Sequence, residues 1–248
     1  MTQASKSVLG IDFGGTGIKG TTVDLETGEF TAERVRIKTP EDSTPQAVAE
    51  VFAELVASFP DVDTVGVTVP GVVRHGVVQS AGNISQSWIG TNADRVLSEA
   101  IGHTVHAIND ADAAGLAEER YGAARGQRGL VIMTTLGTGI GGALLYDGVL
   151  IPNAELGQVE INGRIGEQWT ANSVREEEDL SWEEWGERLT VYYRKVERLL
   201  TPDLFVVGGG VSKEADKFLH LIDVATPIVA ASLRNRAGIV GAALWGAS

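Results

Sequence analysis

Cysteine is absent from the 248-residue sequence. The chain therefore has no disulfide bonds, no thiolate nucleophile and no cysteine ligands for zinc. Long apolar runs are also missing, which predicts that no segment spans a membrane. The first seven residues are polar and include one lysine, with none of the apolar stretch typical of a signal peptide. Together these absences predict a soluble protein of the cytoplasm.

Positive charge is scarce. The sequence has 20 Lys and Arg residues against 33 Asp and Glu residues, a formal net charge of −13. A general nucleic-acid binder needs many cations to neutralise backbone phosphates, so nucleic acid is excluded as a partner. A smaller phosphate ligand is still compatible with this charge, because backbone N–H groups, a metal ion and a few local cations can hold it.

Glycine, by contrast, is plentiful, and it is concentrated in two similar turns. They are Gly14-Gly15-Thr16-Gly17 and Leu136-Gly137-Thr138-Gly139. A shift of 122 positions places Gly15–Gly20 on Gly137–Gly142, and each copy lies between apolar, strand-like segments. We interpret the repeat as a duplicated β-hairpin, one copy in each of two lobes that face each other across a cleft.

Each copy also satisfies the glycine pattern of dinucleotide-binding proteins, G-x-G-x-x-G. That pattern requires a helix immediately after the turn. Gly20-Thr21-Thr22-Val23 is rich in β-branched residues, and Gly28 follows soon after. A helix does not fit there, so the hairpin interpretation is favoured over a Rossmann fold.

The two turns have the chemistry of a phosphate site. Glycines let backbone N–H groups approach an anion closely, Thr16 and Thr138 add hydroxyl donors, and Lys19 adds a positive charge. Asp12 precedes the first turn, where it is placed to hold a metal ion or its water. Ordinary tight hairpin turns are the alternative for either copy alone. The matching pair, with a lysine and an aspartate beside one copy, favours phosphate.

A second group of polar residues, Asn109-Asp110, separates a strand predicted at 105–108 from a helix predicted at 111–121. A carboxylate in this place can accept a proton from a substrate hydroxyl, a role worth about 10²- to 10⁴-fold in rate. The alternative role of Asp110 is to cap the helix. Asn83, Glu155 and Gln158 stand in glycine-punctuated loops and suit the hydroxyls of a sugar, although each alone is more often a plain loop residue.

The remaining pattern alternates strands and helices. Helices are predicted at 45–59, 94–101, 182–200 and 235–245, and apolar strands at 65–69 and 204–207. The helix at 182–200 begins with a capping-box pattern, Ser181 with Glu184. Its aromatic stripe is predicted to lie in the core.

Taken together, these motifs resemble the ROK family of repressors, open reading frames and sugar kinases, over nearly the whole chain. Within the family the resemblance is closest to glucokinases that use polyphosphate. The segments that carry it are Leu9–Lys19, Ala81–Ile84, Trp88–Gly90, Asn109–Asp112, Thr135–Gly141, Glu155–Gly157 and Val207–Lys213.

The resemblance implies an α/β protein with the actin-like ATPase (ribonuclease H-like) fold, two lobes and a central cleft. The small lobe would comprise residues 1–108 and 234–248, and the large lobe 109–233. The implied reaction transfers a phosphoryl group from inorganic polyphosphate, or also from ATP, to the 6-hydroxyl of glucose with Mg²⁺. The implied assembly is a homodimer. Many family members bind zinc through a cysteine cluster, which this chain lacks, so no zinc is expected.

The resemblance also assigns roles to individual residues. Asp110 corresponds to the general base, and Asp12 to an indirect Mg²⁺ ligand. The sugar-binding positions are Gly71, Asn83, Asn109, Glu155, Gln158 and Glu167. The phosphate-binding positions are Asp12, Gly14, Gly15, Thr16, Lys19, Gly137, Thr138, Gly139, Gly209 and Lys213. Gln158 stands where the family usually has histidine, so sugar affinity or selectivity is expected to differ.

Three other functions are compatible with parts of this pattern. A strictly ATP-dependent hexokinase would use the same turns. A sugar-responsive repressor would need a DNA-binding module, and only seven residues precede the first predicted strand. A non-catalytic sugar-sensing protein would be expected to lack Asp110. A polyphosphate donor would also need a basic groove, and the candidates are Arg74, Arg125, Arg128, Lys213 and Lys217.

Overall fold

The structure, a computed structural model, describes residues 8–248, so the predictions made for the first seven residues lie outside it. The chain forms two compact units. The first comprises the chain up to Ala117 together with Arg236–Ser248, and the second is Glu118–Asn235. The assignment of residues 1–108 with 234–248, and of 109–233, to the two lobes of a kinase stays a prediction. Within the described chain, no helix is long and apolar enough to cross a bilayer.

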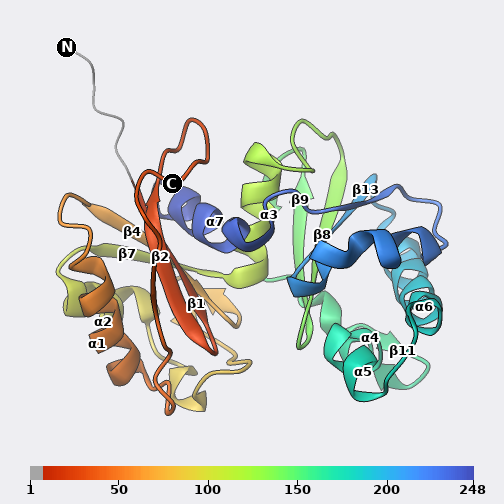
Figure 1. The fold of residues 1–248 in the computed structure, drawn as a ribbon, viewed down its shortest axis with the longest axis horizontal. Coiled ribbons are helices and arrows are strands. Elements are labelled where there is room, and N and C mark those ends of the chain that lie inside the picture. The colour runs from red at the N-terminus through yellow and green to blue at the C-terminus, as the bar shows by residue number, and fades with distance from the viewer. Residues whose placement is uncertain (1–7) are drawn as a thin grey trace. The chain divides into compact units, whose positions relative to one another are not determined.

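The first unit is built on a five-stranded sheet in the order β3-β2-β1-β4-β7 (Figure 1). Its strands are β1 (Val8–Gly14), β2 (Gly17–Val23), β3 (Val35–Ile37), β4 (Thr64–Val69) and β7 (Thr104–Asn109). β1, β2 and β3 pair antiparallel, whereas β1, β4 and β7 pair parallel. The carboxyl ends of the three parallel strands therefore lie at one edge of the sheet, the usual place for ligands in α/β proteins.

Helices cover both faces of this sheet. They are α1 (Pro45–Val56), α2 (Ala93–Ile101) and α7 (Ala237–Gly246), while α3 (Asp110–Tyr121) packs on α7. Leu9, Ile11 and Phe13 alternate along β1 and bury their side chains in one core with Phe52 and Leu55 of α1. Since alternate residues of a strand face opposite ways, the positions between them face α7. The small hairpin β5 (Val73–Arg74) and β6 (Val77–Val78) and the short helix η1 (Gln86–Trp88) complete the unit.

Glycines let α7 pack directly on the backbone of the sheet. A Cβ atom added at Gly66 of β4 would lie 1.7 Å from the carbonyl oxygen of Ala242, and one at Gly10 of β1 would lie 2.0 Å from that of Ile239. Any side chain at these positions would push helix and sheet apart. The alanine- and glycine-rich end of the sequence thus forms the tightly packed helix that its composition predicts.

Replacement of Gly66 by alanine is accordingly expected to destabilise the protein by about 2–3 kcal/mol, because the well-packed interface has no room for a methyl group. Urea unfolding followed by circular dichroism measures the change. Gly210→Ala is the matched control, since a Cβ at Gly210 would meet no atom within 4 Å. Equal stability of the two variants would contradict the close approach of α7.

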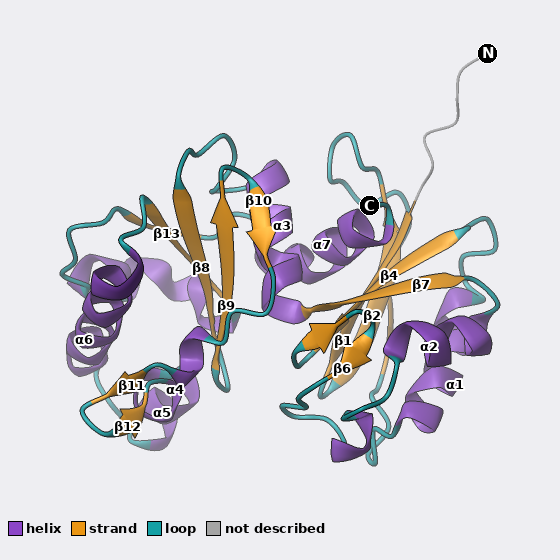
Figure 2. Ribbon diagram, turned by 180° about the vertical axis from the view of Figure 1, so that it is seen from behind, coloured by secondary structure: helices purple, strands orange, loops and turns teal. Residues whose placement is uncertain are grey.

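The second unit repeats the strand pattern of the first. Its sheet has the order β10-β9-β8-β13-β14, with β10, β9 and β8 antiparallel and β8, β13 and β14 parallel (Figure 2). The strands are β8 (Leu130–Leu136), β9 (Ile140–Tyr146), β10 (Val149–Ile151), β13 (Leu204–Gly208) and β14 (Ile228–Ala230). The duplicated hairpin is therefore confirmed, with β1–β2 as one copy and β8–β9 as the other. A strand follows each glycine turn, which excludes the Rossmann interpretation.

The remaining elements of the second unit are mostly helical. They are η2 (Leu156–Gln158), β11 (Glu160–Ile161), β12 (Arg164–Ile165), α4 (Glu167–Thr170), α5 (Asn172–Glu177), α6 (Trp182–Leu200), η3 (Gly210–Lys217) and η4 (Leu219–Leu221). The last short helix, η5 (Arg234–Arg236), leads back toward the first unit.

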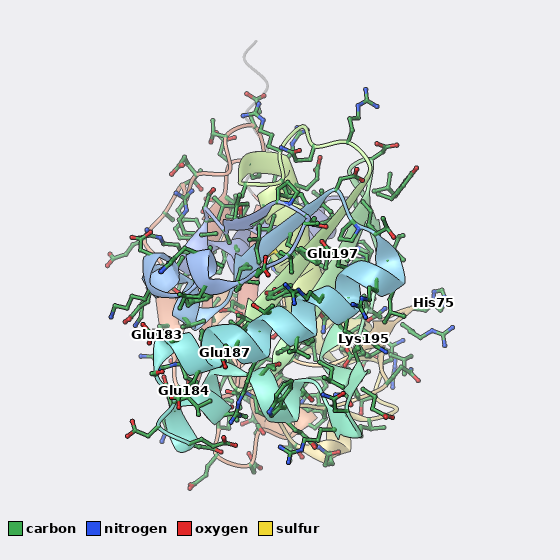
Figure 3. The ribbon with its side chains drawn as sticks, turned by 90° about the vertical axis from the view of Figure 1, so that its right-hand side faces the viewer. His75, Glu183, Glu184, Glu187, Lys195 and Glu197 are labelled. Carbon is green, nitrogen blue, oxygen red and sulfur yellow. The ribbon has the colours of Figure 1, made fainter. Side chains whose placement is uncertain are left out.

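Helix α6 confirms two predictions. The capping box is present, since the Ser181 side chain accepts a hydrogen bond from the Glu184 N–H and Glu184 accepts one from the Ser181 N–H. The aromatic stripe is core: Trp185 and Tyr192 are fully buried. The opposite face of α6 is charged, as Figure 3 shows for Glu187 and its neighbours along the helix.

Candidate functional site

The first glycine turn joins β1 and β2, with Gly14 and Gly17 as the last paired residues. Neither Gly14, Gly15 nor Gly17 has a positive φ, so backbone conformation does not require glycine here. Space does. A Cβ at Gly15 would lie 2.8 Å from Asn83 Nδ2, and one at Gly17 would lie 2.9 Å from Arg36 Nε. The turn thus brings Asn83, predicted to contact sugar, against the predicted phosphate loop.

Asp12 and Lys19 face each other across the same hairpin. Lys19 Nζ lies 3.4 Å from Asp12 Oδ2, and Thr68 Oγ1 donates a hydrogen bond of 3.2 Å to Asp12 Oδ1. Thr68 also accepts a hydrogen bond of 3.1 Å from the Phe13 N–H. Gly238 of α7 leaves space above Asp12, since its Cβ would lie 3.3 Å from the carboxyl carbon. The carboxylate is therefore held at the end of β1, beside the turn.

Asp12 and its neighbours fit a Mg²⁺ ion that the protein holds through one carboxylate. Among the described residues, no three His, Cys, Asp or Glu side chains group as a metal site. Mg²⁺ in phosphoryl-transfer enzymes typically takes one or two carboxylates together with substrate phosphates and water. A single carboxylate beside an anion-binding turn matches that donor set.

At the end of β7, Asn109 caps α3. Its Oδ1 accepts hydrogen bonds from the N–H groups of Ala111 (2.8 Å) and Asp112 (3.1 Å), while its Nδ2 donates to the Gly71 carbonyl (3.1 Å). Asp110 is the first residue of the helix, is exposed, and accepts from the Ala111 N–H at 2.9 Å. The capping role weighed for Asp110 thus falls mainly to Asn109. This leaves Asp110 as the exposed carboxylate at the strand end.

The predicted residues of the first unit are therefore joined at one edge of the sheet. Gly71 is bonded to Asn109, and the loop that follows Gly71 carries Asn83 back to the first glycine turn. Gly71 itself leaves no room for a side chain, because a Cβ there would lie 2.0 Å from the Ser80 carbonyl oxygen. Phosphate-side and sugar-side candidates consequently come from the ends of β1, β4 and β7.

In the second unit, Glu167 reaches the second glycine turn from the start of α4. Its Oε2 accepts a hydrogen bond of 3.1 Å from the Ile140 N–H, and a Cβ at Gly139 would lie 2.5 Å from that oxygen. Gln158 Nε2 donates to Glu167 Oε1 at 2.6 Å. Glu167 thus links Gln158 to the turn that was predicted to bind phosphate.

The nearby Glu155 is electrostatically perturbed. Loss of solvation raises its pKa above the ordinary glutamate value, and the carboxylate of Glu167 raises it further. Two acidic groups close together favour a ligand that offers hydroxyl donors, as a sugar does. The three residues Glu155, Gln158 and Glu167 are therefore brought together as one polar group.

Further residues brace the second turn. Ser173, at the start of α5, donates from its N–H to the Gly137 carbonyl (3.1 Å) and from Oγ to the Thr138 carbonyl (2.7 Å). Gly209 has φ +83°, and a Cβ there would lie 2.3 Å from the Leu136 carbonyl oxygen. Gly209 therefore packs on the strand end that leads into the turn, and η3 follows it.

The basic residues predicted for a polyphosphate groove do not all remain available. Lys217 pairs with Glu214 at 2.5 Å and lies 5.4 Å from the ring centre of Trp182. Lys213, on the same short helix, is exposed. Arg125 and Arg128 are exposed in the loop after α3, and Arg74 is exposed in the β5–β6 hairpin of the first unit.

Sequence reasoning missed Thr68, Ser173 and Arg36 as neighbours of the two turns. Thr68 had a signal, because it is the one polar residue in the apolar strand Val65–Val69. Ser173 and Arg36 had none, since their neighbours are distant in sequence.

Comparison with known proteins identifies the family. The sequence model of the ROK family matches residues 8–168. A polyphosphate glucokinase of Mycobacterium tuberculosis (strain CDC 1551 / Oshkosh) is 50% identical over 237 residues, 95% of this chain and 89% of the relative. The chain belongs to the ROK family.

Solved structures show the fold. The polyphosphate/ATP-glucomannokinase from Arthrobacter sp. strain KM is 51% identical, with a TM-score of 0.92 over 97% of this chain and 98% of that one. A ROK glucokinase from Streptomyces griseus, crystallised with glucose and AMPPNP, is 24% identical with a TM-score of 0.84 over 97% and 98% of the two chains. The predicted α/β fold of the actin-like ATPase type is confirmed.

Proposed function

We propose that this ROK-family protein is a glucokinase that transfers a phosphoryl group from inorganic polyphosphate, or also from ATP, to the 6-hydroxyl of glucose. The observation that carries the proposal is the identity of about one half, over nearly the whole chain, to a polyphosphate glucokinase and to a polyphosphate/ATP-glucomannokinase. The glycine turns, Asp110 and the polar group around Glu155 supply the chemistry that such a reaction needs.

Asp110 acts as the general base in this proposal. It accepts the proton of the glucose 6-hydroxyl, whose oxygen forms a bond to the terminal phosphorus of the donor. The bond from that phosphorus to its bridging oxygen breaks, and the shortened polyphosphate, or ADP, leaves. Gly71, Asn83, Asn109, Glu155, Gln158 and Glu167 orient the sugar through their polar side chains or backbone groups.

The glycine turns hold the donor. Backbone N–H groups and the hydroxyls of Thr16 and Thr138 bind phosphate oxygens, and Lys19 adds a positive charge. The other residues assigned to phosphate are Gly14 and Gly15 in the first unit and Gly137, Gly139, Gly209 and Lys213 in the second. Asp12 would hold a Mg²⁺ ion through its water shell, and the bound ion would neutralise charge on the phosphates. Because the transition state is loose and its charge is spread over several oxygens, positioning and electrostatics supply most of the acceleration.

The donor is tested by supplying purified protein with glucose, Mg²⁺ and either polyphosphate or ATP. Glucose 6-phosphate is expected with both donors and faster with polyphosphate, as measured by coupled dehydrogenase assay. Turnover with ATP alone would show a strictly ATP-dependent hexokinase. Glucose binding without turnover on either donor would show a sugar-sensing protein.

We further propose a cytoplasmic location, a homodimer and no bound zinc, since the chain has no cysteine to bind zinc. Light scattering during size-exclusion chromatography measures the assembly, and metal analysis of the purified protein measures zinc. A monomer, or stoichiometric zinc, would contradict the corresponding part of the proposal.

A further inference from the structure

The edge strand β3, with the residue on either side of it, alternates between exposed cations and half-buried apolar residues. Val35 and Ile37 pack against the core of the first unit, whereas Arg34, Arg36 and Lys38 alternate with them and are exposed. Alternate residues of an extended segment share a face and lie about 7 Å apart. Three cations therefore follow one another along about 13 Å of chain.

This basic row begins at the first glycine turn. Arg36 pairs in register with Lys19 of β2, which pairs with Asp12 of β1. The guanidinium of Arg36 lies over Gly17, since a Cβ there would be 2.9 Å from Nε and 3.3 Å from Nη2. The position of Gly17 thus lets a guanidinium approach the backbone of the phosphate turn.

No carboxylate of the described residues neutralises the charges of these three side chains. Within residues 8–248, no carboxylate oxygen lies within 4 Å of the charged nitrogens of Arg34, Arg36 or Lys38, whereas Lys217 is paired with Glu214. A run of three unpaired cations contrasts with a formal net charge of −13. Such a local exception points to an anionic ligand.

Charges on an edge strand have another use, because they discourage pairing with other chains. Protection of the edge does not require three cations on one face, and it does not require a guanidinium placed against a glycine turn. Protection of the strand edge therefore does not explain the whole basic row, and an anionic ligand explains the rest.

We propose that Arg34, Arg36 and Lys38 form a binding track for linear inorganic polyphosphate, and that the chain continues along β3 from the phosphate groups held at the first glycine turn. The inference rests on the proposed function and deepens it. A nucleoside triphosphate has only three phosphates, so it reaches the track less than a long chain does. The track then determines affinity for long polyphosphate more than affinity for ATP.

The test uses a variant with Arg34, Arg36 and Lys38 all replaced by glutamine. Its matched control carries the same change at Arg95, Lys195 and Arg198, which are exposed helix residues; Lys195 is visible on α6 in Figure 3. A rival variant changes Arg125, Arg128 and Lys213. KM is measured for ATP, tripolyphosphate and long-chain polyphosphate at saturating glucose, and binding of long-chain polyphosphate is measured directly by calorimetry.

The track variant is expected to raise KM and Kd for long-chain polyphosphate about tenfold more than KM for ATP, because three exposed ion pairs are lost. The effect should shrink as salt is added, Arg36→Lys should retain most of the affinity, and Tm should stay near that of the wild type. Equal effects in the track and control variants, or an effect confined to the rival variant, would overturn the inference. So would displacement of polyphosphate by single-stranded RNA at similar concentrations.

The outcome separates the track from the proposed function. If the wild type forms no glucose 6-phosphate from polyphosphate, the proposed function fails, and the calorimetry still decides the track. Loss of polyphosphate binding in the track variant would then support it, and unchanged or absent binding would refute it.

Discussion

Asp110→Asn is expected to lower kcat by about 10²- to 10⁴-fold while leaving glucose affinity within a few-fold of the wild type. Asparagine has nearly the shape of aspartate, so the start of α3 should be preserved. It has no carboxylate to accept the proton of the 6-hydroxyl, so the transfer step loses its base. Steady-state kinetics measure kcat, and calorimetry with glucose measures binding.

Asp61→Asn is the control for this experiment. Asp61 is exposed in the turn between α1 and β4, so removal of its charge should leave turnover unchanged. If Asp110→Asn retains turnover comparable to that control, Asp110 is not the base. If it loses glucose binding as well as turnover, its role is to hold the sugar.

Glu118→Ala is expected to destabilise the protein by roughly 3–5 kcal/mol, the largest effect on stability that we predict. Glu118 is completely buried, and its carboxylate accepts three backbone hydrogen bonds. Oε2 accepts from Ala123 (2.7 Å) and Ser232 (3.0 Å), and Oε1 accepts from Leu233 (2.6 Å). Alanine would remove the shared acceptor of these three part-buried hydrogen bonds, and a donor left unsatisfied away from water costs about 1–3 kcal/mol.

The control for Glu118 is its neighbour on α3, Glu119→Ala, which is expected to cost less than about 1 kcal/mol because Glu119 is partly exposed. Urea unfolding of both variants gives the comparison. Glu118 adjoins one point where the chain passes between the compact units, and Leu233 is close to the other. A loss of less than 1 kcal/mol for Glu118→Ala would show that water or other acceptors replace the carboxylate.

Much of the fold was predictable because the signals for it are local. The β-branched run after the first glycine turn favours a strand, and the second turn is followed by another apolar segment, so the two hairpins followed from adjacent residues. The helix at Trp182–Leu200 followed from its spacing and from the capping box at its start. The repeat also predicted two similar hairpins, although it did not contain the full order of strands that both sheets share.

The candidate site was predictable to a smaller extent. Asn109 and Asp110 were recognised as a pair, but the division of labour between them depends on which side chain meets the N–H groups of α3. Glu167 was matched to a sugar contact, and the structure adds that it braces the second glycine turn through Ile140. Both refinements require side-chain geometry, which residue order does not contain.

By itself the sequence determined the two glycine turns, the strands that flank them, the absence of cysteine chemistry and the ROK-family motifs. The tertiary structure alone decided which distant residues became neighbours: Thr68 beside Asp12, Ser173 beneath Thr138, Arg36 over Gly17, and Leu233 against Glu118. The physical reason is the same in each case. Turns and helices depend on interactions within a few residues, whereas these contacts depend on strand register and on buried polar groups that must find partners wherever the chain brings them.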